Sequence, residues 1–447
     1  MATKRAGKGE DSQSKADAHP TDLNPTTKTF EFGGPLGAGA LVVVLPATVL
    51  GLFLTVNKSG SPPAWVLNLD YNGLKSALSS IKLFDAKSVA VVLGWFGFQV
   101  ILERVLPSDD ATGTELRDGS KLQYSINAFK AFVASGLAIG GMTAVYGLKP
   151  LVWVADHVVP LGVASMGLST AIALHMYSRS FGKGALLALG GNTGSSVYDF
   201  FIGRELNPRV GKSTFDWKYF CELRPGLIGW AVLNAAFAAK QYTELGRVTD
   251  SMVLVNAFQA YYVVDALWNE PAILTTMDIV MDGFGYMLAF GDLAWVPFTY
   301  SLQARYLADH PNDLGATKAA AIVALKLLGL YIFRASNSQK NAFRTNPDAP
   351  EVKHLKYINT PTGSRLLTSG WWGSARHINY TGDWLMAVAW CLPTGFKTPL
   401  TYFYPIYFAV LLIHRAMRDD EKCRHKYGKA WEEYCKKVPY LFVPGLI

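Results

Sequence analysis

Apolar stretches recur along nearly the whole chain, and they constrain the fold more than any other feature. They cover approximately residues 37–56, 89–106, 128–148, 151–177, 226–239, 252–268, 284–302, 319–333, 385–396 and 402–413. A helix needs about 20 apolar residues to cross a bilayer upright. Half of all residues are hydrophobic and 17% are charged, whereas about 25% of residues are charged in soluble domains. The sequence therefore predicts an all-α polytopic membrane protein with about ten transmembrane helices.

The last two stretches, 385–396 and 402–413, are shorter than an upright crossing requires. They are compatible with tilted helices, a re-entrant segment, or a hairpin that turns at 395–399. We count 151–177 as a single span.

Basic residues gather in the segments 204–224 and 340–376 and in the tail from residue 415. Lys and Arg favour cytosolic loops, and ten crossings place all three segments on the side of the N-terminal tail. We therefore expect cytosolic N- and C-termini. This asymmetry accounts for the net charge of +8 without a nucleic-acid partner. Residues 1–30 read as a disordered polar tail, and 31–447 as one integral membrane domain with cytosolic loops.

Two common kinds of site are not indicated. The four cysteines form no CxxC pair, so neither disulfides nor a metal site is predicted. No GxGxxG follows a strand-like run, and the glycine-rich segment 190–194 lacks the Lys-Ser/Thr of a P-loop. Any nucleotide must be held by another kind of fold.

Five carboxylates fall within or beside the sixth and seventh spans: Asp265, Glu270, Asp278, Asp282 and Asp292. Ionisable groups at membrane depth usually line an interior cavity, so these residues are candidates for a functional site. The alternative is that 270–282 is a cytosolic loop with solvated charges.

Lys340 and Arg344 are spaced i, i+4, which places both cations on one helical face, where they can grip a phosphate. Ser336 or Asn337 is expected to cap the start of this helix. The alternative is a juxtamembrane helix that meets anionic lipid headgroups.

Aromatic rings and amides surround this cationic pair in the sequence. Trp371 and Trp372 offer flat surfaces for a cofactor ring, or act as interfacial membrane anchors. Arg376, Asn379 and Tyr380 come directly before the ninth span. The tail adds Asp419, Cys423, Arg424, His425, Lys426, Tyr427 and Tyr434. Together these residues predict a pocket for a dinucleotide or adenosyl cofactor between a cytosolic loop and the tail, within residues 319–447.

An apolar substrate is expected to enter this pocket sideways from the bilayer. Tyr261 and Tyr262 lie beside the carboxylates and are candidates to line its deeper half. A buried phenol can donate a proton, as can a protonated carboxylic acid. The alternative for either tyrosine is core packing with a satisfied hydroxyl.

Several long motifs resemble the sterol reductase family, in its delta-14 sterol reductase and lamin B receptor branch. They are Gly-Arg-Glu-Leu-Asn-Pro-Arg at 203–209, Phe-Cys-Glu-Leu-Arg-Pro-Gly at 220–226, Tyr-Val-Val-Asp-Ala-Leu-Trp at 262–268, Thr-Thr-Met-Asp at 275–278 and Asp-Gly-Phe-Gly at 282–285. The resemblance extends from about residue 32 to 447. Lamin B receptors carry an added N-terminal module, so about 30 polar residues before the first span favour a plain reductase. The sequence Arg-His-Ile-Asn-Tyr-Thr-Gly-Asp at 376–383 is similar to that of fungal members of the family. Ile378 stands where many members have a proline.

The resemblance implies an NADPH-dependent oxidoreductase of the endoplasmic reticulum membrane, with a nuclear-envelope location left open. The implied NADPH-binding residues are Lys340, Arg344, Leu367, Trp372, Asn379, Tyr380, Asp419, Cys423, Arg424, His425, Lys426, Tyr427 and Tyr434. The implied reaction is reduction of the C14–C15 double bond of sterol 8,14-dienes in ergosterol-type biosynthesis. We expect Tyr262 to donate the proton, with Asp419 placing the nicotinamide or relaying the proton. Asp278 and Glu270 are second choices for the donor.

Two alternatives remain open at this stage. The last quarter of the chain is also similar to isoprenylcysteine carboxyl methyltransferases, which use an adenosyl cofactor. A non-catalytic sterol-binding protein of the nuclear envelope would keep the pocket without the reaction.

Overall fold

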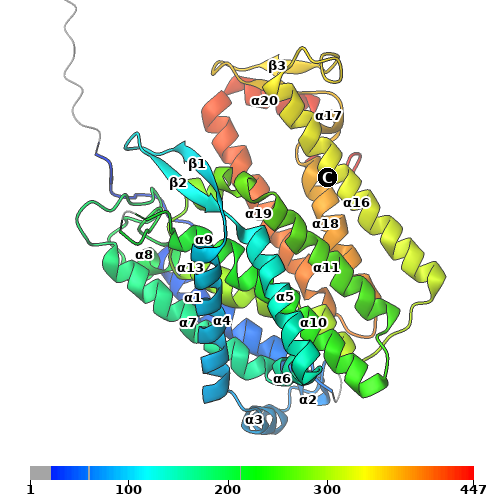
Figure 1. Ribbon diagram of the computed structural model, residues 1–447. Coiled ribbons are helices and arrows are strands. Elements are labelled where there is room, and N and C mark those ends of the chain that lie inside the picture. The colour runs from blue at the N-terminus through cyan, green and yellow to red at the C-terminus, as the bar shows by residue number, and fades with distance from the viewer. Residues whose placement is uncertain (1–21, 59–60, 212, 447) are drawn as a thin grey trace, which may run out of the picture.

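The computed structural model describes residues 22–58, 61–211 and 213–446 (Figure 1). The polar tail expected over 1–30 lies outside the described residues up to residue 21. Its end is ordered, because Thr27 donates hydrogen bonds from its backbone N to the Asn192 carbonyl (2.8 Å) and from its Oγ1 to the Leu189 carbonyl (2.7 Å). The boundary at residue 30 between tail and membrane domain stays a prediction.

The described residues are mostly helical. The first half of the chain contains α1 (Gly34–Thr55), α2 (Ala64–Leu67), α3 (Tyr71–Ser80), α4 (Ala86–Val105), α5 (Ala128–Tyr146), α6 (Lys149–Asp156), α7 (Val158–Arg179), α8 (Ser196–Ile202) and α9 (Trp217–Leu223). The second half contains α10 (Pro225–Leu245), α11 (Asp250–Trp268), η1 (Glu270–Thr275), α12 (Met277–Val280), α13 (Tyr286–Phe290), η2 (Gly291–Trp295), α14 (Val296–Tyr300), α15 (Leu302–Asp309), α16 (Ala316–Thr345), α17 (Trp371–Ser374), α18 (Ile378–Cys391), η3 (Leu392–Thr394), η4 (Leu400–Tyr402), α19 (Phe403–Tyr427) and α20 (Lys429–Lys437).

Within the described residues, six helical segments are long and apolar enough to cross a membrane. They are α1, α4, α5, α7, α16 and the segment that joins η4 to α19. The chain is therefore a helical membrane protein with several apolar helices, which is consistent with a polytopic one. The remaining expected spans are helical too, but α10 buries Asn234, Lys240 and Gln241 among its apolar residues. The count of ten crossings stays a prediction.

Two expected spans are interrupted. The stretch 151–177, which we counted as one helix, breaks at His157 between α6 and α7. The stretch 284–302 is divided into α13, the π-helical turn η2 and α14, with Pro297 near the start of α14. Proline cannot supply a backbone N–H to a helix ladder, which accounts for the irregular geometry here.

The expected helix start at Ser336 or Asn337 is wrong, because α16 continues through both residues to Thr345. The Ser336 hydroxyl donates to the carbonyl of Phe333 within the same helix (3.2 Å). A serine whose hydroxyl bonds back to the preceding turn does not cap a new helix. Lys340 and Arg344 therefore lie in the last turns of a membrane-spanning helix.

A close backbone contact joins α16 to α18. A Cβ atom at Gly329 would lie 2.7 Å from the carbonyl oxygen of Gly382, and one at Gly382 would lie 2.7 Å from that of Gly329. Small residues let two helices approach to backbone contact in a membrane. This contact brings the end of α16 beside the start of α18.

Two antiparallel hairpins interrupt the expected all-α fold. One pairs β1 (Asp109–Glu115) with β2 (Lys121–Ile126), and the other pairs β3 (Tyr357–Asn359) with β4 (Arg365–Leu367). Figure 1 shows β3 near α20 at one end of the helix bundle, whereas α3 and α6 lie at the opposite end.

Candidate functional site

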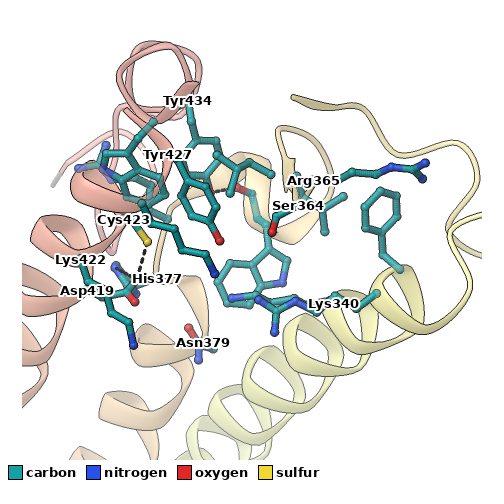
Figure 2. Close-up of a pocket in the computed structure, with 18 of the residues that line it drawn as sticks. Lys340, Ser364, Arg365, His377, Asn379, Asp419, Lys422, Cys423, Tyr427 and Tyr434 are labelled. Atoms are coloured by element: carbon teal, nitrogen blue, oxygen red, sulfur yellow. Dashed lines mark hydrogen bonds and ion pairs between the residues drawn. The ribbon is translucent and has the colours of Figure 1, made fainter. Parts of the chain in front are cut away.

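A cavity of about 750 Å³ opens at the end of the bundle where α16 ends and α18 begins. The hairpin β3–β4, the C-terminal part of α19 and α20 complete its wall (Figure 2). The predicted residues that line it are Lys340, Arg344, Leu367, Trp372, Asn379, Tyr380, Asp419, Cys423, Lys426, Tyr427 and Tyr434. Arg424 and His425 do not line it. Arg424 instead pairs with Asp420 one helical turn away (2.8 Å).

Trp372 lies at the centre of the cavity wall and is 5% exposed. Its indole Nε1 donates to the carbonyl of Ser336 (2.7 Å), and the ammonium of Lys340 lies 3.8 Å from the ring centroid. The Tyr434 hydroxyl donates to the Trp372 carbonyl (3.3 Å). Trp372, Lys340 and Tyr434 therefore share one cavity, as expected. A buried Trp372 is not an interfacial membrane anchor.

The cavity wall carries a strong excess of positive charge. Its cations are Lys340, Arg344, Arg365, Arg376, Lys422 and Lys426, and its one carboxylate among the described lining residues is Asp419. None of these six cations has a carboxylate within 4.0 Å among the described residues. A concave surface with this charge pattern attracts a polyanion.

His377 adds no charge to this wall. Its imidazole is buried and stacks on Tyr380 with ring centroids 4.9 Å apart. Burial lowers the pKa of His377 to about 4. The nearby cations of Lys340 and Arg376 act in the same direction. The ring is therefore neutral at pH 7, because burial disfavours the charged form.

Asn379 and Tyr434 offer neutral polar groups to a ligand. The Asn379 Nδ2 donates to Asn337 Oδ1 (3.4 Å), while the Asn379 Oδ1 is buried with no hydrogen-bond partner among the described residues. An orphaned buried acceptor costs free energy until a ligand donor satisfies it. Burial raises the pKa of Tyr434, which keeps its phenol protonated. The unused Asn379 Oδ1 is an acceptor, so it suits a ligand that carries an amide N–H.

The sequence did not indicate the roof of the cavity. Gly363, Ser364 and Arg365 line it from the hairpin β3–β4, and Phe343 and Pro347 line it from the segment that leads there. Figure 2 shows Ser364 and Arg365 on the side of the cavity opposite Asp419 and His377. Pro361 and Gly363 were the local sequence signals for a turn between these strands, and Gly363 adopts a positive φ of 78°.

Tyr262 lies on α11 and does not line this cavity. Its ring centroid lies 5.7 Å from that of Trp230 and 5.4 Å from that of Trp390. Trp390 and Tyr380 belong to the same helix, and their spacing along α18 corresponds to about 15 Å. Tyr262 therefore lies deeper in the bundle than Asp419, and the two do not meet in the described cavity.

The solvated-loop interpretation is wrong for Glu270, which is 1% exposed. Its carboxylate accepts hydrogen bonds from the Tyr219 hydroxyl (2.6 Å) and the Ala128 backbone N (2.7 Å). Arg224 Nη2 lies 3.5 Å away and is fully buried. These contacts join α5, α9 and η1, so Glu270 stabilises the packing of these elements. It does not line the cationic cavity.

Two of the other carboxylates pair with distant elements, whereas Asp292 has a buried Oδ2 without a hydrogen-bond partner among the described residues. Asp278 pairs with Arg415 of α19 (3.2 Å), and Asp265 pairs with Arg334 of α16. The backbone carbonyl of Asp282 accepts from Lys218 (2.7 Å). None of these residues lines the cationic cavity.

The motifs around residues 203 and 283 interlock two loops. A Cβ atom at Gly203 would lie 2.4 Å from the backbone of Gly283, and the Phe284 backbone N donates to the Glu205 carbonyl (3.0 Å). Glycine is required at these positions because a side chain would collide with the backbone of the other loop. Neither Gly203 nor Gly283 lines the cationic cavity.

A sequence model described as the Ergosterol biosynthesis ERG4/ERG24 family matches residues 26–447. The chain belongs to this family. It is 48% identical to the Delta(14)-sterol reductase of Ascobolus immersus over 427 residues, which cover 94% of this chain and 99% of that protein. It is 50% identical to Delta(14)-sterol reductase erg24 of Schizosaccharomyces pombe over 420 residues, 93% and 96% of the two chains.

The family membership expected from the motifs is confirmed, including its branch. Delta(14)-sterol reductase LBR of Gallus gallus is 50% identical over 427 residues, which cover 95% of this chain and 65% of that protein. The similarity to methyltransferases concerned only the last quarter of the chain, whereas the family match covers nearly all of it.

Proposed function

We propose that this protein reduces the C14–C15 double bond of sterol 8,14-dienes in ergosterol-type sterol biosynthesis, with NADPH as the reductant. Identity of 48% over 94% of the chain to a Delta(14)-sterol reductase carries this proposal. The unpaired cations around a 750 Å³ cavity support a phosphorylated cofactor. The protein acts in the endoplasmic reticulum membrane with both termini in the cytosol, or also in the nuclear envelope.

Distinct groups of the cavity suit distinct parts of NADPH. Lys340, Arg344 and Lys426 suit the phosphates, because charge-assisted hydrogen bonds to phosphate are strong. The Asn379 Oδ1 suits the carboxamide, whose N–H groups would satisfy it. Asp419 suits a ribose hydroxyl or the carboxamide. When bound, NADPH supplies a hydride.

Reduction of a diene that carries no electron-withdrawing group requires a proton donor. The olefin accepts no hydride until C15 is protonated, which leaves a tertiary allylic cation at C14. The proton donor must therefore lie in a water-poor part of the bundle, within reach of the sterol.

Tyr262 is the proposed donor. Its hydroxyl makes no hydrogen bond to the described residues, so its proton is available to a ligand, and its ring is held between Trp230 and Trp390. Trp230 is itself fixed by its Nε1 bond to Gln259 (2.9 Å). The side chain of Tyr262 is 38% exposed, which leaves it open to a sterol that enters from the bilayer.

Isotope labelling tests the reaction, and it also tests whether the hydride is added at C14 and the proton at C15. The purified full-length protein is supplied with a sterol 8,14-diene and NADPH deuterated at C4 of the nicotinamide, and the product is analysed by mass spectrometry and NMR. The proposal predicts deuterium at C14, and in a separate reaction in D₂O it predicts deuterium at C15. No loss of the diene, or methyl transfer from S-adenosylmethionine instead, overturns it.

A further inference from the structure

A second cavity, of about 1,030 Å³, lies among α4, α5, α6, α7 and α10. It shares no lining residue with the cationic cavity, so a ligand here does not meet a cofactor bound there. Its volume reaches the upper end of the range for small-molecule sites, which is about 300–1,000 Å³. We name it the lipid groove.

The wall of the lipid groove is apolar and opens sideways. Trp95, Phe96, Ile139 and Leu168 are among its lining residues. Val145 lines it and is 73% exposed, so the groove reaches the outer surface of α5. Both α4 and α5 are candidate membrane spans. The opening therefore faces acyl chains rather than water.

Few side chains of α5 are buried by protein. Its buried residues are Ala128, Ala131 and Ser135, all in its first half. The second half of α5 faces the groove and its opening, where Met142 and Val145 line the wall. An apolar occupant between α4 and α5 would fill space that protein side chains leave open, which restores the lost dispersion contacts.

One end of the lipid groove is cationic. Lys87 lies at the start of α4 and Lys149 at the start of α6, and the Lys87 ammonium lies 4.5 Å from the ring centroid of Trp153 on α6. No described lining residue of the groove is acidic. Neither lysine has a carboxylate within 4.0 Å among the described residues. Figure 1 shows α6 at the end of the bundle away from α20.

Two hydroxyls of largely buried serines on the groove wall provide a second signal for an amphiphilic ligand. Ser165 lines the groove, is 7% exposed and has no hydrogen-bond partner among the described residues. Ser135 lines it too, is 1% exposed and accepts a hydrogen bond from Gln99 Nε2 (2.9 Å), which leaves its own hydrogen unused. Buried polar groups are normally satisfied, and ester carbonyls would satisfy both hydroxyls.

We propose that the lipid groove binds one anionic phospholipid, with its acyl chains between α4 and α5 and its phosphate between Lys87 and Lys149. A sterol carries one neutral hydroxyl and leaves the two cations without a counter-charge. A second copy of the chain would bring another pair of lysines to the same edge, and like charges repel. The anionic headgroup is the occupant that the charges favour.

Photo-crosslinking of the full-length protein in nanodiscs tests this site. The probes are photoactivatable phosphatidylserine, phosphatidylcholine and a sterol, each at a low fraction in phosphatidylcholine, and labelled peptides are mapped by mass spectrometry. We expect the phosphatidylserine probe to label α4 and α5, and unlabelled phosphatidylserine to compete for the label. Equal labelling by phosphatidylcholine, or displacement by the sterol, overturns the proposal.

Matched variants separate the groove from the rest of the surface. Ala138→Trp fills the groove and should abolish the labelling, whereas Leu137→Trp, at a neighbouring residue that is 72% exposed and does not line the groove, should leave it unchanged. Lys149→Glu should reduce the phosphatidylserine affinity by about fivefold or more, because a basic side chain near anionic lipid contributes about that factor. Lys75→Glu, on exposed α3, is the control. If Ala138→Trp is not monodisperse, the wild-type competition between lipids still decides the outcome.

Discussion

The ammonium of Lys340 lies 3.8 Å from the ring centroid of Trp372, although the two residues belong to different helices. The indole is fixed by its bond to the Ser336 carbonyl, one turn before Lys340 on α16. The position of the ammonium in the cationic cavity is therefore determined by tertiary packing rather than by a flexible surface side chain. This arrangement makes the cofactor site directly testable.

Replacement of Lys340 by alanine should weaken NADPH binding strongly. Loss of a hydrogen bond to a charged group costs about 1.5–3 kcal/mol, which corresponds to roughly a 10- to 100-fold rise in Kd. Titration of the purified protein with NADPH measures the change. Lys353→Ala, at an exposed residue that does not line the cavity, is the matched control. An unchanged Kd in Lys340→Ala would remove this residue from the phosphate site.

Tyr262→Phe should abolish turnover while NADPH still binds, because the substitution removes only the hydroxyl proton. The measurement pairs diene consumption with an NADPH titration on the same preparation. Tyr261→Phe is the control, since Tyr261 is a neighbouring phenol with a similar exposure of 43%. Normal turnover by Tyr262→Phe would show that another group protonates C15.

Glu270→Ala should lower the melting temperature sharply without a specific effect on cofactor affinity. Removal of one partner of a buried ion pair costs about 3–5 kcal/mol, and Arg224 would be left buried and uncompensated. Thermal unfolding in detergent measures the loss, with the exposed Glu432→Ala as control. A stable Glu270→Ala protein that binds NADPH but is inactive would instead support an acid role.

The low pKa of His377 predicts a pH-dependent loss of stability. A histidine whose folded pKa is depressed stabilises the fold above its unfolded pKa of about 6.5, and this contribution is lost as pH falls toward about 4. We expect His377→Gln to lose less thermal stability than the wild type between pH 7 and pH 5. His354→Gln, at an exposed position, should behave like the wild type. Parallel losses in all three proteins would contradict this explanation.

The residue types of the proposed cofactor site could be predicted from the sequence, because cations, rings and amides are concentrated in the last quarter of the chain. The complete set of residues that line the cavity could not be predicted from the sequence. The strands β3 and β4 have three residues each, too few for an alternating pattern to be recognised. Arg424 and His425 were included by motif, but neither lines the cavity, whereas their neighbours Cys423 and Lys426 do.

Other differences come from tertiary contacts that local patterns do not encode. Ser336 has a residue type that often caps helices, yet it is fully buried inside the continuous α16, where its carbonyl accepts from Trp372 Nε1. The burial of Glu270 depends on Arg224 and Tyr219, which belong to another part of the chain. The break at His157, by contrast, has a local cause in Pro160, which lies in the first turn of α7 and has no backbone N–H to donate to the Asp156 carbonyl.

The glycine contact between α16 and α18 fixes the depth of one helix against the other. Lys340 belongs to the first helix, and Trp390, the neighbour of Tyr262, belongs to the second. A ligand held in the cationic cavity at one end of this helix pair would consequently extend toward Trp390 by a constant length. A single added methyl group at Gly329 or Gly382 would push α16 and α18 apart. The distance between Lys340 and Trp390 would then change, although neither of those residues had been substituted.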